Sequence, residues 1–172
     1  MRKMLPFLIL LLTAGPSYAQ RKTENLVIIT MDGMRWQEVF GGIDTAILGI
    51  ERFRDDSSAM MQQFWSGSVQ ERRRKLMPFL WETIAKQGQV YGNRRKGSYA
   101  NVTNPFWFSY PGYNEIFTGY PDTLVNSNDK VPNPNINVLE YINSQPSYRN
   151  KVAAFNSWDV FPYIINILRS GI

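Results

Sequence analysis

The sequence contains no cysteine and no histidine among its 172 residues. Without cysteine no disulfide can form, so a secreted domain of this composition depends for its stability on its hydrophobic core and on any bound metal. Histidine, the commonest metal ligand in proteins, is absent as well. Carboxylate and hydroxyl oxygens are therefore the metal ligands that these residues can offer.

The sequence also lacks an apolar run of the roughly 20 residues that a membrane-spanning helix needs. What it has instead is a basic start at Arg2 and Lys3, a short apolar stretch over residues 5–13, and small residues at Ser17 and Ala19. This pattern predicts a signal peptide over residues 1–19, cleaved before residue 20. In a bacterial host the mature chain would be secreted or periplasmic, with no membrane span.

The net charge of the mature chain is small. Removal of Arg2 and Lys3 with the signal peptide lowers the 19 basic residues to 17 against 14 acidic ones, a net of +3. Such a balance gives no indication of a nucleic-acid partner. The one dense basic run, residues 72–75, precedes an apolar segment at residues 76–86. We expect the run to be a solvated flank of that helix, and a polyanion-binding role is the alternative.

Apolar segments alternate along the chain in a way that predicts a layered fold. Residues 26–31 form a continuous, β-branched run typical of a strand buried on both faces, and two shorter strands are expected at residues 89–93 and 151–155. Helical patterns lie between and after them, over residues 34–40, 57–64, 76–86 and 160–168 and after Pro111 and Asn135. This order predicts an α/β fold, a mostly parallel sheet with helices on both faces. Three strands are few for such a sheet, so we expect the fold to be incomplete in this chain.

Ser109 stands at the start of a predicted helix, because Pro111 suits a first helical turn and Gly119 a helix end. Free backbone N–H groups and the helix dipole favour an anion at that position. A nucleophile that attacks a phosphate is one interpretation of Ser109. The alternative is an ordinary helix N-cap. The aromatic residues 106–108 before it are expected to bury the loop or, alternatively, to line a pocket.

Asp32 follows the first predicted strand, where ligands bind in open α/β sheets. The Asp32 carboxylate and the Ser109 hydroxyl come from separate segments and are both hard oxygen ligands. They suit a shared divalent metal.

Residues 27–35, Val-Ile-Ile-Thr-Met-Asp-Gly-Met-Arg, followed by Ser109-Tyr110-Pro111 and Thr118-Gly119, resemble the alkaline phosphatase superfamily. The most similar branch is the type I phosphodiesterase/nucleotide pyrophosphatase group, with its sulfatase and phosphoglycerate mutase relatives. The resemblance implies that Asp32 binds one of two metal ions, usually zinc. It implies that Ser109 is a metal ligand and the nucleophile, and that Asn128, or else Asn126, donates to a phosphate oxygen.

The resemblance therefore implies a metal-dependent hydrolase of small phosphate mono- or diesters that works through a phosphoserine intermediate. A sulfatase is disfavoured, because Pro111 is followed by Gly112-Tyr113 rather than by a small residue and Arg. A phosphate mutase and an inactive remnant remain as alternatives.

The family completes its two-metal site with further Asp and His residues, which this sequence does not contain in the expected pattern. We therefore expect residues 20–172 to be the N-terminal part of an alkaline phosphatase-like catalytic domain. The 172 residues alone are expected to be a fragment without turnover. The sequence does not indicate an oligomeric state.

Overall fold

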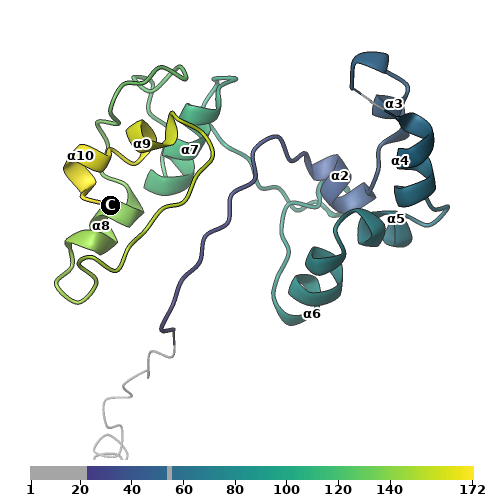
Figure 1. The fold of residues 1–172 in the computed structure, drawn as a ribbon, viewed down its shortest axis with the longest axis horizontal. Helices are drawn as coiled ribbons and strands as arrows, with labels where there is room; N and C mark the ends of the chain where they lie inside the picture. Colours follow the sequence, from purple (N-terminus) through teal and green to yellow (C-terminus); the bar gives the residue numbers. More distant parts are fainter. Residues whose placement is uncertain (1–22, 54–55) are drawn as a thin grey trace, which may run out of the picture. The chain divides into compact units, whose positions relative to one another are not determined.

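The computed structural model describes residues 23–53 and 56–172, so the predicted signal peptide lies outside the described residues. The described chain divides into two units, residues 23–31 and residues 32–172. Within the second unit, helices fall into an earlier group, α2 to α6, and a later group, α7 to α10 (Figure 1). Among the described residues, no helix is both long enough and apolar enough to cross a bilayer.

The predicted α/β fold is wrong, because the described ranges contain helices and no β-strand. Residues 26–31 have no regular secondary structure and pair with no other described segment, and their side chains are exposed, Val27 and Ile29 to 78% each. Residues 89–93 and 151–155 are likewise unpaired. β-Branched composition favours an extended backbone, but a strand forms only when a neighbouring segment completes its hydrogen bonds. The composition therefore suggested a strand for which the described chain provides no partner.

The earlier helices are short, and polar side chains cap several of their starts. Asp44 caps α3 by accepting a hydrogen bond from Ala46, and Asp56 and Ser68 cap α4 and α5 in the same way. The group comprises α2 (Trp36–Gly41), α3 (Thr45–Leu48), η1 (Glu51–Phe53), α4 (Ser57–Phe64), α5 (Val69–Leu76), η2 (Leu80–Ile84), α6 (Ala85–Gln87) and η3 (Arg94–Lys96). The helices predicted at residues 34–40 and 57–64 are confirmed to within two residues.

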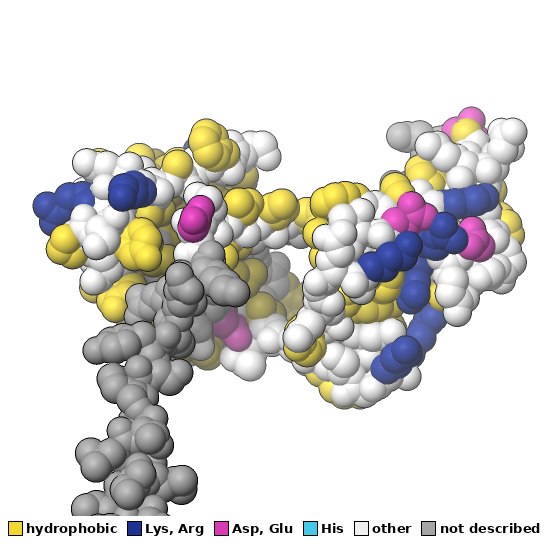
Figure 2. All heavy atoms as spheres, turned by 90° about the horizontal axis from the view of Figure 1, so that it is seen from below, with side chains coloured by type: hydrophobic (Ala, Val, Ile, Leu, Met, Phe, Trp, Pro, Cys, Tyr) yellow, Lys and Arg dark blue, Asp and Glu magenta, His cyan; other side chains and the backbone are white. Residues whose placement is uncertain are grey.

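The basic run at residues 72–75 forms the last turn of α5 rather than a flank ahead of a helix. The guanidinium of Arg72 lies 4.6 Å from the ring centre of Trp65, and that of Arg73 lies 3.7 Å from the ring centre of Trp81. Arg74 pairs with Glu71 and Glu82, and Lys75 donates to the carbonyl of Trp65. Figure 2 shows Lys and Arg side chains gathered on this group of helices. The run therefore holds α5 against its neighbours through cation–π contacts and ion pairs.

The later helices are α7 (Ser109–Thr118), α8 (Val138–Ser144), α9 (Phe161–Ile164) and α10 (Ile167–Ser170). Their core is apolar and largely aromatic, with Tyr113 edge-on to Phe161 at 5.4 Å between ring centres. Helix α7 packs against α8 and α9. The helix predicted over residues 160–168 is interrupted, because Asn166 adopts a left-handed conformation with φ of 48° between α9 and α10.

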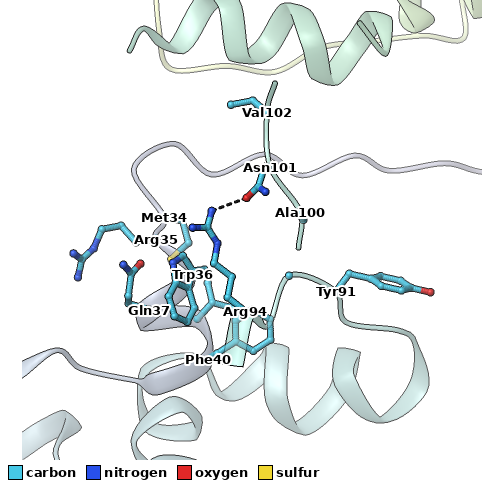
Figure 3. A pocket seen from close by; sticks show the side chains of 12 residues that line it. Met34, Arg35, Trp36, Gln37, Phe40, Tyr91, Arg94, Ala100, Asn101 and Val102 are labelled. Atoms are coloured by element: carbon cyan, nitrogen blue, oxygen red, sulfur yellow. Dashed lines mark hydrogen bonds between the residues drawn. The ribbon is translucent and has the colours of Figure 1, made fainter. Parts of the chain in front are cut away.

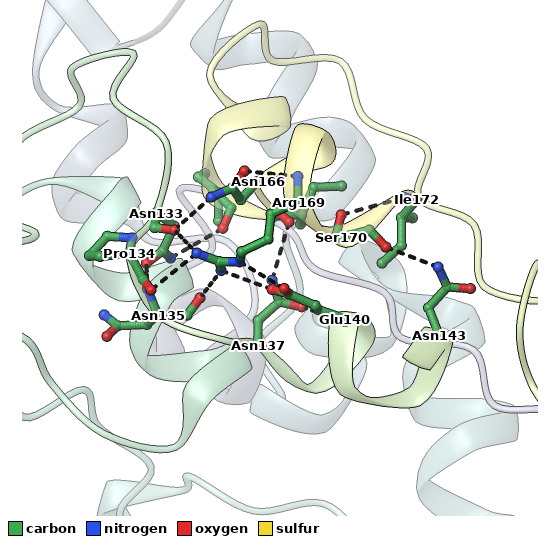
Figure 4. Close-up of polar contacts among 12 residues, drawn as sticks. Asn133, Pro134, Asn135, Asn137, Glu140, Asn143, Asn166, Arg169, Ser170 and Ile172 are labelled. Atoms are coloured by element: carbon green, nitrogen blue, oxygen red, sulfur yellow. Dashed lines mark hydrogen bonds and ion pairs between the residues drawn. The ribbon is translucent and has the colours of Figure 1, made fainter. Parts of the chain in front are cut away.

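Hydrogen bonds order the segment between α7 and α8, which its composition predicts to be a loop (Figure 4). Asn133 is fully buried, and its amide donates to Asn114 Oδ1 at 3.0 Å and to the carbonyl of Ile164 at 3.1 Å. The guanidinium of Arg169 donates to the carbonyls of Asn133, Pro134 and Asn135 and pairs with Glu140. The loop is therefore fixed to α7, α9 and α10 by side-chain contacts rather than by regular secondary structure.

Candidate functional site

Ser109 is the first residue of α7, as the sequence predicts. Phe108 precedes it in an extended conformation, and Gly119 ends the helix in a left-handed conformation with φ of 84°. Pro111 falls in the first turn, where its missing N–H costs no helix hydrogen bond. Of the backbone N–H groups at this helix start, Pro111 has none and that of Tyr110 donates to Asn128. The backbone N–H of Ser109 and the positive end of the helix dipole therefore remain next to the Ser109 hydroxyl.

The Ser109 hydroxyl does not cap the helix. The N-cap position belongs to Phe108, and the helix start has no side-chain cap from that position. Within the described ranges the Ser109 Oγ makes no hydrogen bond, although the residue is half-buried. The interpretation of Ser109 as an ordinary N-cap is therefore wrong, and the hydroxyl remains available for another partner.

Asn128 lies at the same helix end. Its side-chain oxygen accepts a hydrogen bond of 3.0 Å from the backbone N–H of Tyr110, the residue after Ser109. The amide nitrogen of Asn128 has no hydrogen-bond partner among the residues that the structure describes. Asn126, the competing candidate, instead donates to the carbonyl of Thr123 at 3.3 Å. The structure thus brings Asn128 to the start of α7, and its predicted contact with a phosphate oxygen stays a prediction.

Glu115 holds the loop that leads into Ser109. Its carboxylate accepts hydrogen bonds from the backbone N–H groups of Thr103 and Asn104, at 2.6 and 3.0 Å, and from both of their side chains, at 2.9 and 3.0 Å. Partial burial raises the pKa of Glu115, but these four hydrogen bonds outweigh it and lower the pKa from 4.5 to about 2. Because the carboxylate stays ionised at neutral pH, the loop before Ser109 is tied to the body of α7.

Tyr110 holds the same end of α7 in place through its buried side chain. Its side chain is buried, and its hydroxyl donates to the carbonyls of Val131 and Tyr163, at 2.8 and 3.1 Å. Burial raises the pKa of Tyr110 to about 12, and the charge of Arg169 opposes this shift in part. Sequence inspection did not single out Glu115 or Tyr110, because their partners lie 11 to 53 residues away along the chain and leave no local pattern.

Contrary to the expectation that they bury the loop, the aromatic residues before Ser109 are not all buried. Trp107 is 98% exposed and Phe108 is 49% exposed, whereas Phe106 is half-buried. Trp107 and Phe108 therefore present apolar surface next to the Ser109 position, since both immediately precede it in the chain.

Asp32 lies in an exposed turn, and its carboxylate accepts a hydrogen bond from the backbone N–H of Gly33 at 2.8 Å. No hydrogen bond joins Asp32 to Ser109 in the part of the chain that the structure covers. A catalytic zinc ion uses three protein ligands and a structural one uses four. Residues 23–53 and 56–172 contain no group of three acidic side chains placed to bind a metal. Asp32 and Ser109 are too few to hold a metal ion by themselves, so their assignment as metal ligands stays a prediction.

Comparisons with models of protein families, with curated proteins and with solved structures find no match for this chain.

Proposed function

We propose that this chain carries the nucleophile of a phosphoric ester hydrolase and that Ser109 Oγ is the atom that attacks phosphorus. The observation that carries the proposal is the start of α7, where a half-buried hydroxyl without a hydrogen-bond partner in the described chain stands at the positive end of the helix dipole and near the amide of Asn128. These are the groups that bind a phosphate and stabilise its developing charge.

The reaction that fits the start of α7 is transfer of a phosphoryl group to Ser109. Ser109 Oγ would form the new bond to phosphorus while the bond to the alcohol oxygen of the ester breaks, and the proton of the Ser109 hydroxyl would pass to the leaving alcohol. Water would then attack the phosphoserine, release phosphate or a phosphomonoester and regenerate the Ser109 hydroxyl. The backbone N–H of Ser109 and the amide of Asn128 would donate to the non-bridging oxygens in both steps.

The resemblance to the alkaline phosphatase superfamily adds a divalent metal requirement, for which zinc is the first candidate. Such an ion would supply the positive charge that lowers the pKa of a serine hydroxyl or of water. Asp32 and Ser109 are the two ligands proposed here, and a complete site needs further donors. We accordingly propose that the 172 residues alone can accept one phosphoryl group but do not turn over.

The test is a single-turnover measurement with p-nitrophenyl phosphate and zinc on the full chain. We expect release of no more than one equivalent of p-nitrophenolate per chain and a phosphoryl group on Ser109 in the mass spectrum of a digest. Ser109→Ala should release none while keeping the same circular dichroism spectrum. Equal release by the wild type and Ser109→Ala, or a phosphoryl group on another residue, would remove Ser109 from the proposed reaction.

A further inference from the structure

We propose that the open cavity between α2 and residues 91–102 binds an anion that carries an aromatic ring, such as a nucleoside monophosphate. The cavity has a volume of about 780 Å³, within the usual range of small-molecule sites. It is lined chiefly by Met34, Trp36, Phe40, Tyr91, Arg94 and Asn101 (Figure 3).

Arg94 supplies the charge that would recognise the anion. One of its terminal nitrogens donates to the side-chain oxygen of Asn101 at 2.6 Å, which is a neutral partner. Figure 3 shows the Arg94 side chain extending across Trp36 toward Asn101. A guanidinium has five donors, so most of those of Arg94 remain for a ligand. Because Asn101 fixes the side chain without neutralising it, Arg94 is positioned to pair with a phosphate.

No carboxylate competes for that charge. None of the residues lining the cavity is acidic. The other lining cation, Arg35, already pairs with Glu38 and with Asp44. Arg95 and Lys96, which follow Arg94 in η3, form no ion pair with any described side chain. The cavity therefore carries a net positive charge on one side, which inorganic phosphate or a phosphate ester would balance.

The other side of the cavity is aromatic. Phe40 is buried and packs edge-on against Trp81 at 5.7 Å between ring centres, so it forms a fixed wall. Trp36 is half-buried, and the guanidinium carbon of Arg94 lies 5.7 Å from its ring centre. An inorganic anion would use Arg94 alone and leave this surface in contact with water. A planar base attached to the phosphate would cover the aromatic surface, and this is the reason for choosing a nucleotide.

This inference does not depend on the function proposed for Ser109. Arg94, Trp36 and Asn101 take no part in the proposed phosphoryl transfer. Binding of a nucleotide at this cavity is an equilibrium property, and Ser109→Ala should leave it unchanged. The two proposals can therefore fail separately.

The test is isothermal titration of the full chain with AMP, adenosine and inorganic phosphate at low ionic strength. We expect saturable 1:1 binding of AMP, with adenosine and phosphate each at least about tenfold weaker, the factor that loss of one charge-assisted contact produces. Arg94→Gln should weaken AMP binding by a similar factor. Arg149→Gln is the matched control, because Arg149 is exposed, makes no side-chain contact in the described part of the chain and should leave affinity unchanged.

Asn101→Asp gives a second, nearly isosteric test. It keeps the contact to Arg94 but adds a carboxylate that neutralises the guanidinium, so AMP affinity should also fall by about tenfold or more, while thermal stability is kept or raised. Equal affinities for AMP and adenosine, wild-type AMP affinity in both Arg94→Gln and Asn101→Asp, or absence of saturable binding by the wild type would each overturn the proposal.

Discussion

The backbone N–H of Tyr110 donates to the side-chain oxygen of Asn128 across a separation of 18 residues, at 3.0 Å. This contact joins the start of α7 to the loop that follows the helix, and it places a free amide group next to Ser109. Its consequences for stability and for phosphate binding can be separated experimentally.

Asn128→Ala should lower the free energy of unfolding by about 1 kcal/mol, because the Tyr110 N–H loses its acceptor. Asn128→Asp should keep or raise stability, since a carboxylate accepts the same hydrogen bond and favours the helix dipole. Urea unfolding measures both effects. In the single-turnover assay Asn128→Asp should nevertheless be slower than the wild type, because it removes the amide donor and repels the phosphate. Wild-type rates in Asn128→Asp would show that the amide does not contact the ester.

Glu115→Gln should destabilise the fold in a pH-dependent way. The folded pKa of Glu115 is lowered from 4.5 to about 2. Its contribution to stability is therefore complete above pH 4.5 and is lost as the pH falls toward 2. Urea unfolding should show a gap between wild type and Glu115→Gln at pH 6 that closes by about pH 2.

Glu51→Gln is the control for Glu115, since Glu51 is exposed and has no side-chain partner within the described residues. It should show no such gap. A difference between wild type and Glu115→Gln that stays constant from pH 6 to 2 would contradict the role given to the ionised carboxylate.

Tyr110→Phe should lower the free energy of unfolding by about 1 kcal/mol, because the Val131 carbonyl loses its donor. The Tyr163 carbonyl keeps the backbone N–H groups of Asn133 and Asn166 as donors. Burial raises the folded pKa of Tyr110 to about 12. Its contribution is therefore complete below the unfolded pKa of about 10 and is lost as the pH rises through 12. Alkaline unfolding of the wild type should be steeper than that of Tyr110→Phe over this range.

Tyr148→Phe is the control for Tyr110, since the Tyr148 hydroxyl is exposed and bonds to no described residue. It should follow the wild type over this range. Parallel alkaline unfolding curves for wild type and Tyr110→Phe would contradict the prediction.

Arg169→Lys should destabilise the loop between α7 and α8 although it keeps the positive charge. The planar guanidinium reaches three consecutive carbonyls and Glu140, and a lysine ammonium cannot match that arrangement. We expect a loss of about 1–3 kcal/mol in urea unfolding and faster amide hydrogen exchange at residues 133–135. Arg149→Lys should change neither quantity. Unaltered exchange at residues 133–135 in Arg169→Lys would show that the loop is held by other contacts.

Local sequence signals correctly predicted the start of α7, its end at Gly119 and the irregular segment after it. Each of these depends on the backbone preferences of a few neighbouring residues, such as Pro111 and Gly119. The sheet could not be predicted in the same way, because a strand needs a partner and residues 26–31 have none in the described chain. The break at Asn166 was missed because apolar residues continue on both sides of it and suggest one helix.

The candidate site was predicted in part. Ser109 was singled out by the predicted helix start and by the resemblance, and Asn128 by the resemblance alone; the structure brings both to one helix end. Glu115, Tyr110 and Arg94 were missed, because each acquires its role from residues that are remote in sequence or that carry no motif. The metal assignment of Asp32 stays a prediction, since it depends on donors that Asp32 and Ser109 do not supply.

The contacts made from the left-handed turn at Asn166 have a consequence for the order in which parts of the chain fold during synthesis. Asn166 and Arg169 both donate to the carbonyl of Asn133, in the same loop that carries Asn128. During synthesis Ser109 leaves the ribosome well before these two anchors exist. The arrangement of Ser109 and Asn128 at the start of α7 would therefore stay incomplete until translation passes residue 169. Its assembly would wait until the later helices can fold.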